Sequence, residues 1–98
     1  MLDEKKYDYL DRLIRFAGDI ILFVKELPRE YGAEVLIKQI IRSASSAALN
    51  FGETQGSPTD RDYVHRASIC LKELRETEVN LKIMKHVGYG ANKREKLL

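Results

Sequence analysis

Cysteine, tryptophan, proline and long apolar runs are scarce or missing from this 98-residue sequence. The scarcity of cysteine and the lack of long apolar runs each exclude a class of protein. The single cysteine, Cys70, excludes an internal disulfide and therefore a disulfide scaffold. The longest apolar runs, such as residues 20–24, are far shorter than the roughly twenty residues that cross a bilayer. No basic segment followed by an apolar stretch and a cleavage site occurs at the N-terminus. We therefore expect one cytoplasmic domain over residues 1–98, with no membrane partner.

The sequence also lacks a strong excess of charge of either sign. Lys and Arg number 17 and Asp and Glu number 15, so the formal net charge is only +2. Such a weak excess does not by itself indicate nucleic-acid binding, and the distribution of the charges must decide that question. Hydrophobic residues at 44% and charged residues at 33% are typical of a globular domain.

Proline and glycine are nearly absent from three long stretches, and this pattern predicts helices joined by short turns. The first predicted helix covers about residues 3–27 and ends before Pro28. The second follows Gly32 and loses its apolar pattern near Gly52 and Gly56.

The third predicted helix has two candidate starts. Ser57 is one N-cap, with Pro58 at the first helical position, and Thr59 is the other. Gly88 is expected to end this helix. Residues 91–98 are basic and compatible with a helix, so a short or truncated fourth helix is expected there.

Apolar residues alternate spacings of three and four along the three predicted helices, which is typical of a bundle seam. The predicted seam positions are Tyr7, Leu10, Ile14, Ala17, Ile21 and Val24, then Ile37, Ile40, Ala44, Ala47 and Phe51, and finally Tyr63, Ala67, Cys70, Leu74, Thr77, Leu81 and Met84. Short connections favour antiparallel neighbours. The predicted fold class is all-α, an antiparallel up-down four-helix bundle with a short or truncated fourth helix.

The second helix is apolar over more than one stripe and needs cover on several sides. Its remaining side carries small neutral residues that let another helix approach closely while they form hydrogen bonds. Acidic residues beside the third seam are at positions that commonly set partner choice in bundles. The predicted oligomer interface is Ser43, Ser46, Asn50, Glu53, Glu73 and Glu76.

At about 100° per residue, the third helix places basic residues in one strip opposite its seam. The strip consists of Arg61, His65, Lys72, Arg75, Lys82 and His86. Such a strip can neutralise phosphates. The predicted nucleic-acid contacts are Arg61, His65, Lys72, Arg75, Lys82 and Lys85. The alternative is a solvated outer face with ordinary ion pairs, such as Asp62–Arg66 or Glu78–Lys82.

No constellation typical of catalysis, metal binding or cofactor binding is found. Cys70 falls in the seam, and the two histidines, His65 and His86, lie far apart without a nucleophile. Arg61 and His65 resemble the arginine–histidine pair of HEPN-type ribonucleases, although fewer residues separate them here. We therefore expect no enzyme, no metal and no cofactor, and a ribonuclease is a minor alternative.

Residues 42–56, RSASSAALNFGETQG, resemble a stretch of the 23S rRNA intervening sequence proteins, a family of four-helix bundles. Asp62, Tyr63 and residues 71–77, LKELRET, extend the similarity to the third helix, so that it covers roughly residues 10–90. The resemblance implies a symmetric homopentamer. In one branch, the accessory proteins of diversity-generating retroelements, it also implies a reverse transcriptase and nucleic acid as partners.

These observations together predict a non-catalytic, homo-oligomeric binding module. Its basic outer face is expected to contact an RNA or DNA backbone, or an enzyme that acts on nucleic acid. The alternative is a structural or protein–protein adaptor that binds no nucleic acid.

Overall fold

The computed structural model describes residues 2–90, which form three α-helices and one short 3-10 helix. The helices are α1 (Leu2–Val24), α2 (Tyr31–Glu53), η1 (Thr54–Gly56) and α3 (Asp60–Val87). The all-α class is therefore confirmed. The four-helix bundle is not confirmed, because the fourth helix was predicted over residues 91–98 and these lie outside the described residues.

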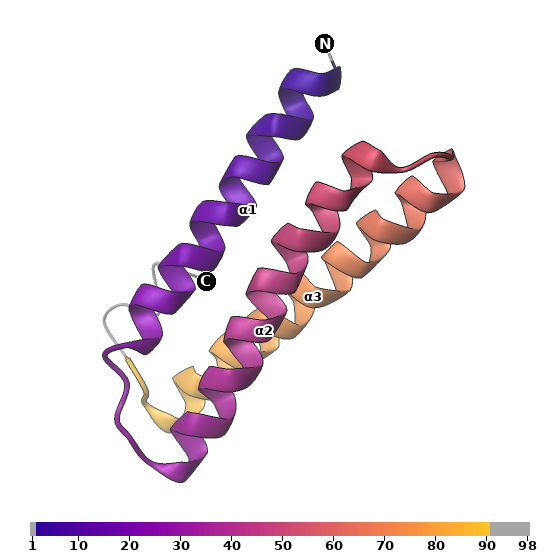
Figure 1. Cartoon of the computed structure of the whole chain (residues 1–98). Coiled ribbons are helices and arrows are strands. Elements are labelled where there is room, and N and C mark those ends of the chain that lie inside the picture. Colours follow the sequence, from indigo (N-terminus) through magenta and orange to yellow (C-terminus); the bar gives the residue numbers. More distant parts are fainter. Residues whose placement is uncertain (1, 91–98) are drawn as a thin grey trace.

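The three long helices run antiparallel in chain order, with α2 in contact with both of the others (Figure 1). The most extensive contact is between α2 and α3, followed by that between α1 and α2. This central place of α2 explains why its apolar zone is wider than a single stripe. None of the helices within residues 2–90 combines the length and the apolarity that a membrane-spanning helix requires.

The observed helix ends differ slightly from the predicted ones. α1 ends at Val24, and the chain continues to Leu27 as a hydrogen-bonded turn in which the Leu27 amide donates to Val24 O at 3.2 Å. Thr59 is the N-cap of α3, since its Oγ1 accepts from the Asp62 amide at 3.1 Å. The second of the two candidate starts is therefore correct. Gly88, with φ of 83°, ends α3 as predicted.

The core lies where the α1–α2 connection meets the C-terminal half of α3. Four large side chains there are 0–1% exposed: Ile20, Ile40, Leu81 and Met84. The seams predicted for α2 and α3 are confirmed at the positions that are buried, which are Ile40, Ala44, Ala47, Cys70, Thr77, Leu81 and Met84.

The seam predicted for α1 is partly wrong. Ala17 and Val24 are buried, but Ile14 is 55% exposed and Ile21 is 39% exposed. The buried positions are instead Ile20, at 0%, and Phe23, at 5%. α1 is apolar over a broad arc and contacts mainly α2. The side of α1 that faces α2 is therefore a different line of apolar residues from the predicted seam.

Two glycines fold the chain back after α3. Gly88 and Gly90 have φ values of 83° and 61°, in the left-handed region that favours glycine. A Cβ atom on Gly90 would lie 2.5 Å from Phe23 Cε1 and 3.2 Å from Leu27 Cδ2. Tyr89, between the glycines, packs against the core. The end of α3 is therefore held against the end of α1.

Candidate binding face of α3 and its supporting network

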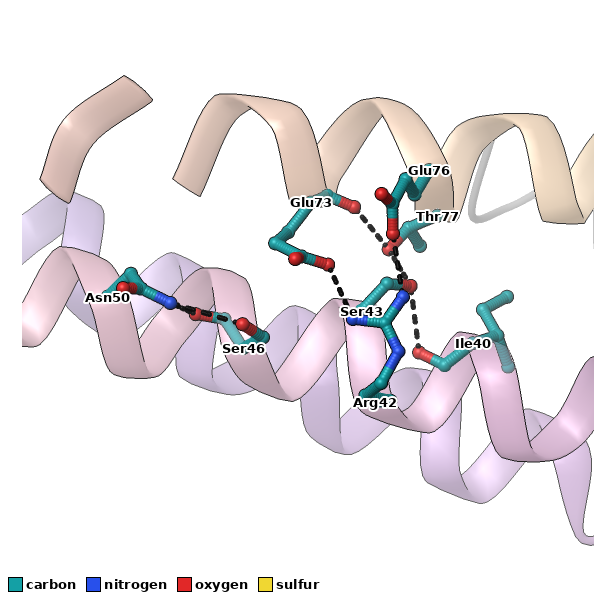
Figure 2. A network of polar contacts seen from close by, with 8 residues as sticks. All are labelled: Ile40, Arg42, Ser43, Ser46, Asn50, Glu73, Glu76 and Thr77. Atoms are coloured by element: carbon teal, nitrogen blue, oxygen red, sulfur yellow. Dashed lines mark hydrogen bonds and ion pairs between the residues drawn. The ribbon is translucent and has the colours of Figure 1, made fainter. Parts of the chain in front are cut away.

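Arg42 of α2 binds two carboxylates of α3 at once (Figure 2). Its Nη1 donates to Glu73 Oε2 at 3.1 Å, and its Nη2 donates to Glu76 Oε2 at 2.7 Å. The hydrogen bond to Glu76 and the charge of Glu73 raise the pKa of Arg42. The hydrogen bond from Arg42 in turn lowers the pKa of Glu76, so that this carboxylate stays ionised.

A pair of hydroxyl groups joins α2 and α3 next to Arg42 (Figure 2). Ser43 Oγ and Thr77 Oγ1 lie 2.7 Å apart, and both side chains are buried. Ser43 Oγ also lies 3.3 Å from Ile40 O, and Thr77 Oγ1 lies 2.9 Å from Glu73 O. Since each hydroxyl has one hydrogen, the pair distributes two hydrogens among three contacts.

Asn50 makes a further polar link between the two helices. Its Nδ2 donates to Ser46 O at 2.9 Å and to Ser46 Oγ at 3.1 Å, within α2 (Figure 2). Its Oδ1 accepts from Arg66 Nη1 of α3 at 3.2 Å. Sequence reasoning missed both Arg42 and Arg66 as links to the neighbouring helix.

The residues predicted to form an oligomer interface have different surroundings. Ser43 is 2% exposed and Glu73 is 7% exposed, and the polar groups of both find partners within the chain. Ser46, Asn50 and Glu76 are half-buried, and Glu53 is exposed. Contact of this group with another copy stays a prediction, and burial leaves Ser43 and Glu73 little surface for it.

The residues predicted to contact nucleic acid all lie exposed on α3. They are Arg61, His65, Lys72, Arg75, Lys82 and Lys85, and His86 is exposed as well. The predicted Lys82–Glu78 pair is present at 3.9 Å. The predicted Asp62–Arg66 pair is wrong, because Arg66 donates to Asn50, and Asp62 accepts from the Thr59 hydroxyl at 2.8 Å.

A groove of about 610 Å³ between α2 and α3 brings part of this basic strip together. Lys72 and Arg75 line it from α3, and Arg42 lines it from α2. Arg61 is not among its lining residues, and His65 lines a separate cavity of about 320 Å³. The groove thus includes Lys72 and Arg75, while the other basic residues of the strip lie exposed along α3 outside it.

The groove also contains groups that sequence reasoning did not assign to it. Val79 and Ile83 line it and are 55% and 45% exposed. Asn80, also in the lining, donates from Nδ2 to Leu36 O at 3.1 Å, whereas its Oδ1 has no partner among residues 2–90. The helical wheel that defined the strip could have predicted the place of Val79. Val79 lies five full turns after Arg61 and therefore on the same side of α3.

The cations exposed on this face of α3 allow electrostatic binding. Cys70 is 5% exposed, and burial raises the pKa of its thiol, which keeps it neutral and unreactive. Within residues 2–90, no three His, Cys, Asp or Glu side chains gather as metal ligands would. The exposed cations of α3 can instead pair with anionic groups of a partner.

Long antiparallel helices joined by a partly buried polar network define an all-α helical protein. The family model of the 23S rRNA-intervening sequence protein matches residues 5–98, and the chain belongs to this family. The family resemblance carried by residues 42–56 and 71–77 is therefore confirmed. No curated protein and no solved structure matches the chain.

Proposed function

We propose that this protein is a non-catalytic binding module that contacts the sugar-phosphate backbone of RNA or DNA through the basic face of α3. Lys72 and Arg75 supply the central contacts, and Arg61, His65, Lys82 and Lys85 extend the face along the helix. Backbone contacts of this kind give affinity with little base specificity. The name of the matched family is consistent with an association with nucleic acid.

One observation carries the proposal: Arg42 pairs with the acidic residues that would otherwise neutralise the basic face. Glu73 and Glu76 are neighbours of Lys72 and Arg75 in the sequence, and both bind Arg42 from the other side. Within residues 8–90, neither Lys72 nor Arg75 forms an ion pair. Besides the hydrogen bond from Arg42, the charge of Lys72 lowers the pKa of Glu76, yet both cations remain exposed and able to contact phosphates.

The test measures the affinity of the protein for a structured RNA and for duplex DNA at increasing salt concentrations. Fluorescence anisotropy of the labelled nucleic acid reports the binding. The double variant Lys72→Ala/Arg75→Ala should weaken binding to every sequence. It should also lower the slope of log affinity against log salt by about 2, because each lost phosphate contact releases about one counterion fewer.

The matched control is Arg12→Ala/Arg15→Ala, which removes the same charge from α1. These arginines are exposed and paired with Asp8 and Asp11 at 3.4 and 3.0 Å. The control should change the slope much less. If both variants lose the same amount of nucleic-acid affinity, the binding depends on net charge alone. If the wild-type protein binds neither RNA nor DNA at low salt, the proposal is excluded.

A second candidate function is docking to an enzyme that acts on nucleic acid, such as a reverse transcriptase. The exposure of Val79 and Ile83 among the basic residues favours it, because apolar side chains contribute to protein contacts and not to phosphate contacts. Val79→Ser/Ile83→Ser should leave nucleic-acid affinity unchanged if the backbone is the ligand. Loss of nucleic-acid affinity in this variant would indicate that the apolar side chains Val79 and Ile83 take part in the contact.

We further propose that the module works as a homo-oligomer, with the homopentamer as the assembly that the family resemblance implies. Large apolar side chains support this proposal, since Leu49 of α2 is 69% exposed and Val64 of α3 is 61% exposed. Repetition of the α3 face around a ring would strengthen weak phosphate contacts. Light scattering coupled to gel filtration measures the assembly, and a monomer at micromolar concentration would contradict it.

A further inference from the structure

A second groove, of about 500 Å³, lies between the C-terminal part of α1 and the N-terminal part of α2. Its apolar lining is Ile21, Val24, Leu27, Ile37 and Ile41. Val24 and Leu27 are each 6% exposed and form a recessed floor, whereas Ile21 is 39% exposed at the edge. The groove involves none of the residues of the α3 face.

The rim of this groove is basic. Lys25, Arg29 and Lys38 line it against a single carboxylate, Glu34. None of the three cations forms an ion pair within residues 8–90, and all three are exposed. The side chains that the structure describes thus leave these charges unpaired at the edge of an apolar surface.

The apolar surface continues along α1 beyond the groove. Ile14 is 55% exposed and lies seven residues before Ile21, which places both on one side of the helix. From Ile14 to Val24 the surface extends about 15 Å, or three helical turns. Its length and its position between two helices match a helix laid into the α1–α2 groove.

We propose that this groove binds an acidic amphipathic helix of a protein partner. The apolar residues of that helix, at spacings of three and four, would pack on Val24, Leu27 and Ile37. Its Asp and Glu side chains would pair with Lys25 and Lys38 at the rim. The proposal is independent of nucleic-acid binding, because the two surfaces share no residue.

The shape and the charge of the groove favour this occupant over others. A flat lipid surface cannot reach the recessed Val24 and Leu27, and a phosphate backbone gains nothing from an apolar floor. A second copy of the chain would bring basic as well as acidic side chains to the basic rim, since Lys and Arg number 17 against 15 Asp and Glu.

Three labelled synthetic peptides of about 14 residues test the proposal by fluorescence anisotropy. One is an acidic amphipathic helix, the second has lysine in place of its acidic residues, and the third has serine in place of its apolar residues. The first should bind most tightly, with an affinity that falls as salt rises. Equal binding of either other peptide would overturn the proposal.

The matching protein variant is Lys25→Glu/Arg29→Glu/Lys38→Glu. These side chains are exposed and unpaired, so circular dichroism should show an intact fold, while affinity for the acidic peptide should fall roughly tenfold or more. Lys72→Glu/Arg75→Glu, which reverses charges on α3, should keep peptide binding.

Two further outcomes would overturn the proposal. If the triple variant changes the mass of the protein in light scattering, a second copy occupies the groove. If wild-type protein binds vesicles containing phosphatidylserine, and the triple variant loses only that binding, the groove belongs to a lipid surface. Unchanged peptide affinity in the triple variant would exclude a role for the basic rim.

Discussion

The two ends of the helix assembly are closed to very different degrees. At the end where α1 joins α2, Ile20, Ile40 and Met84 are completely buried. At the opposite end, where α2 leads into α3, Leu49 is 69% exposed and Val64 is 61% exposed. The same helices run through both ends. The formation of a helix therefore does not by itself determine whether its apolar side chains are buried. The difference between the ends lies in how many neighbours each side chain has.

The largest expected effect comes from truncating a leucine at the closed end. Leu81→Ala should lower the free energy of unfolding by about 2–5 kcal/mol, because it leaves a cavity in the core. The matched change Leu71→Ala lies in the same helix at a side chain that is 50% exposed, and it should cost no more than about 0.5 kcal/mol. Urea denaturation measures both. A comparable loss at Leu71 would mean that the open end is covered in solution.

The turn after α3 should be the next most sensitive place. Gly90→Ala should cost about 2–4 kcal/mol, since it combines a positive φ with a clash against Phe23. Gly88→Ala has the positive φ, but no atom lies within 4 Å of its added Cβ, so it should cost only about 1 kcal/mol. Thermal unfolding compares the two variants. An equal loss of stability in the two variants would show that the Phe23 side chain moves to accommodate the added Cβ atom at little energetic cost.

The hydroxyl pair between α2 and α3 should have a smaller effect. Thr77→Val keeps the shape of the side chain and removes its hydroxyl, which should cost about 0.5–1.5 kcal/mol. A double-mutant cycle with Ser43→Ala isolates the interaction between the two hydroxyls. Strict additivity of the two single changes would contradict a direct bond between them.

The smallest effect should come from the half-buried Glu76. Because its pKa is lowered in the folded chain, its stabilising contribution is present above the ordinary glutamate pKa. That contribution is lost as the pH falls through the lowered value. Glu76→Gln should remove this part of the acid dependence of stability, as measured by urea denaturation between neutral and acidic pH. The same acid slope in the variant would rule out the Arg42 bond as its source.

The helices and much of the core follow from local sequence patterns. The alternation of three and four located Cys70, Thr77, Leu81 and Met84 of α3, but it did not predict the burial of the polar Glu73 and Asn80. The same rule misplaced part of α1, where Ile20 and Ile21 are equally apolar neighbours. Which of them is buried depends on the position of α2, and periodicity alone does not contain that information.

The candidate binding face was only partly predictable, for a similar reason. A helical wheel places Lys72 and Arg75 on one side of α3, and the structure leaves both exposed. It cannot show that Arg42, thirty residues earlier than Lys72, pairs with their acidic neighbours Glu73 and Glu76. Glu73 and Glu76 were assigned to a contact between subunits because their partner within the chain depends on the tertiary structure.

The Ser43–Thr77 pair has a consequence for how α2 and α3 align along their length. A seam made only of aliphatic side chains would tolerate a slide of one helical turn. Such a slide would separate the two hydroxyls and leave each with only a carbonyl of its own helix, Ile40 O for Ser43 and Glu73 O for Thr77. Loss of the buried hydrogen bond between the helices is costly. The pair therefore penalises the neighbouring registers and sets the alignment that brings Arg42 opposite its two glutamates.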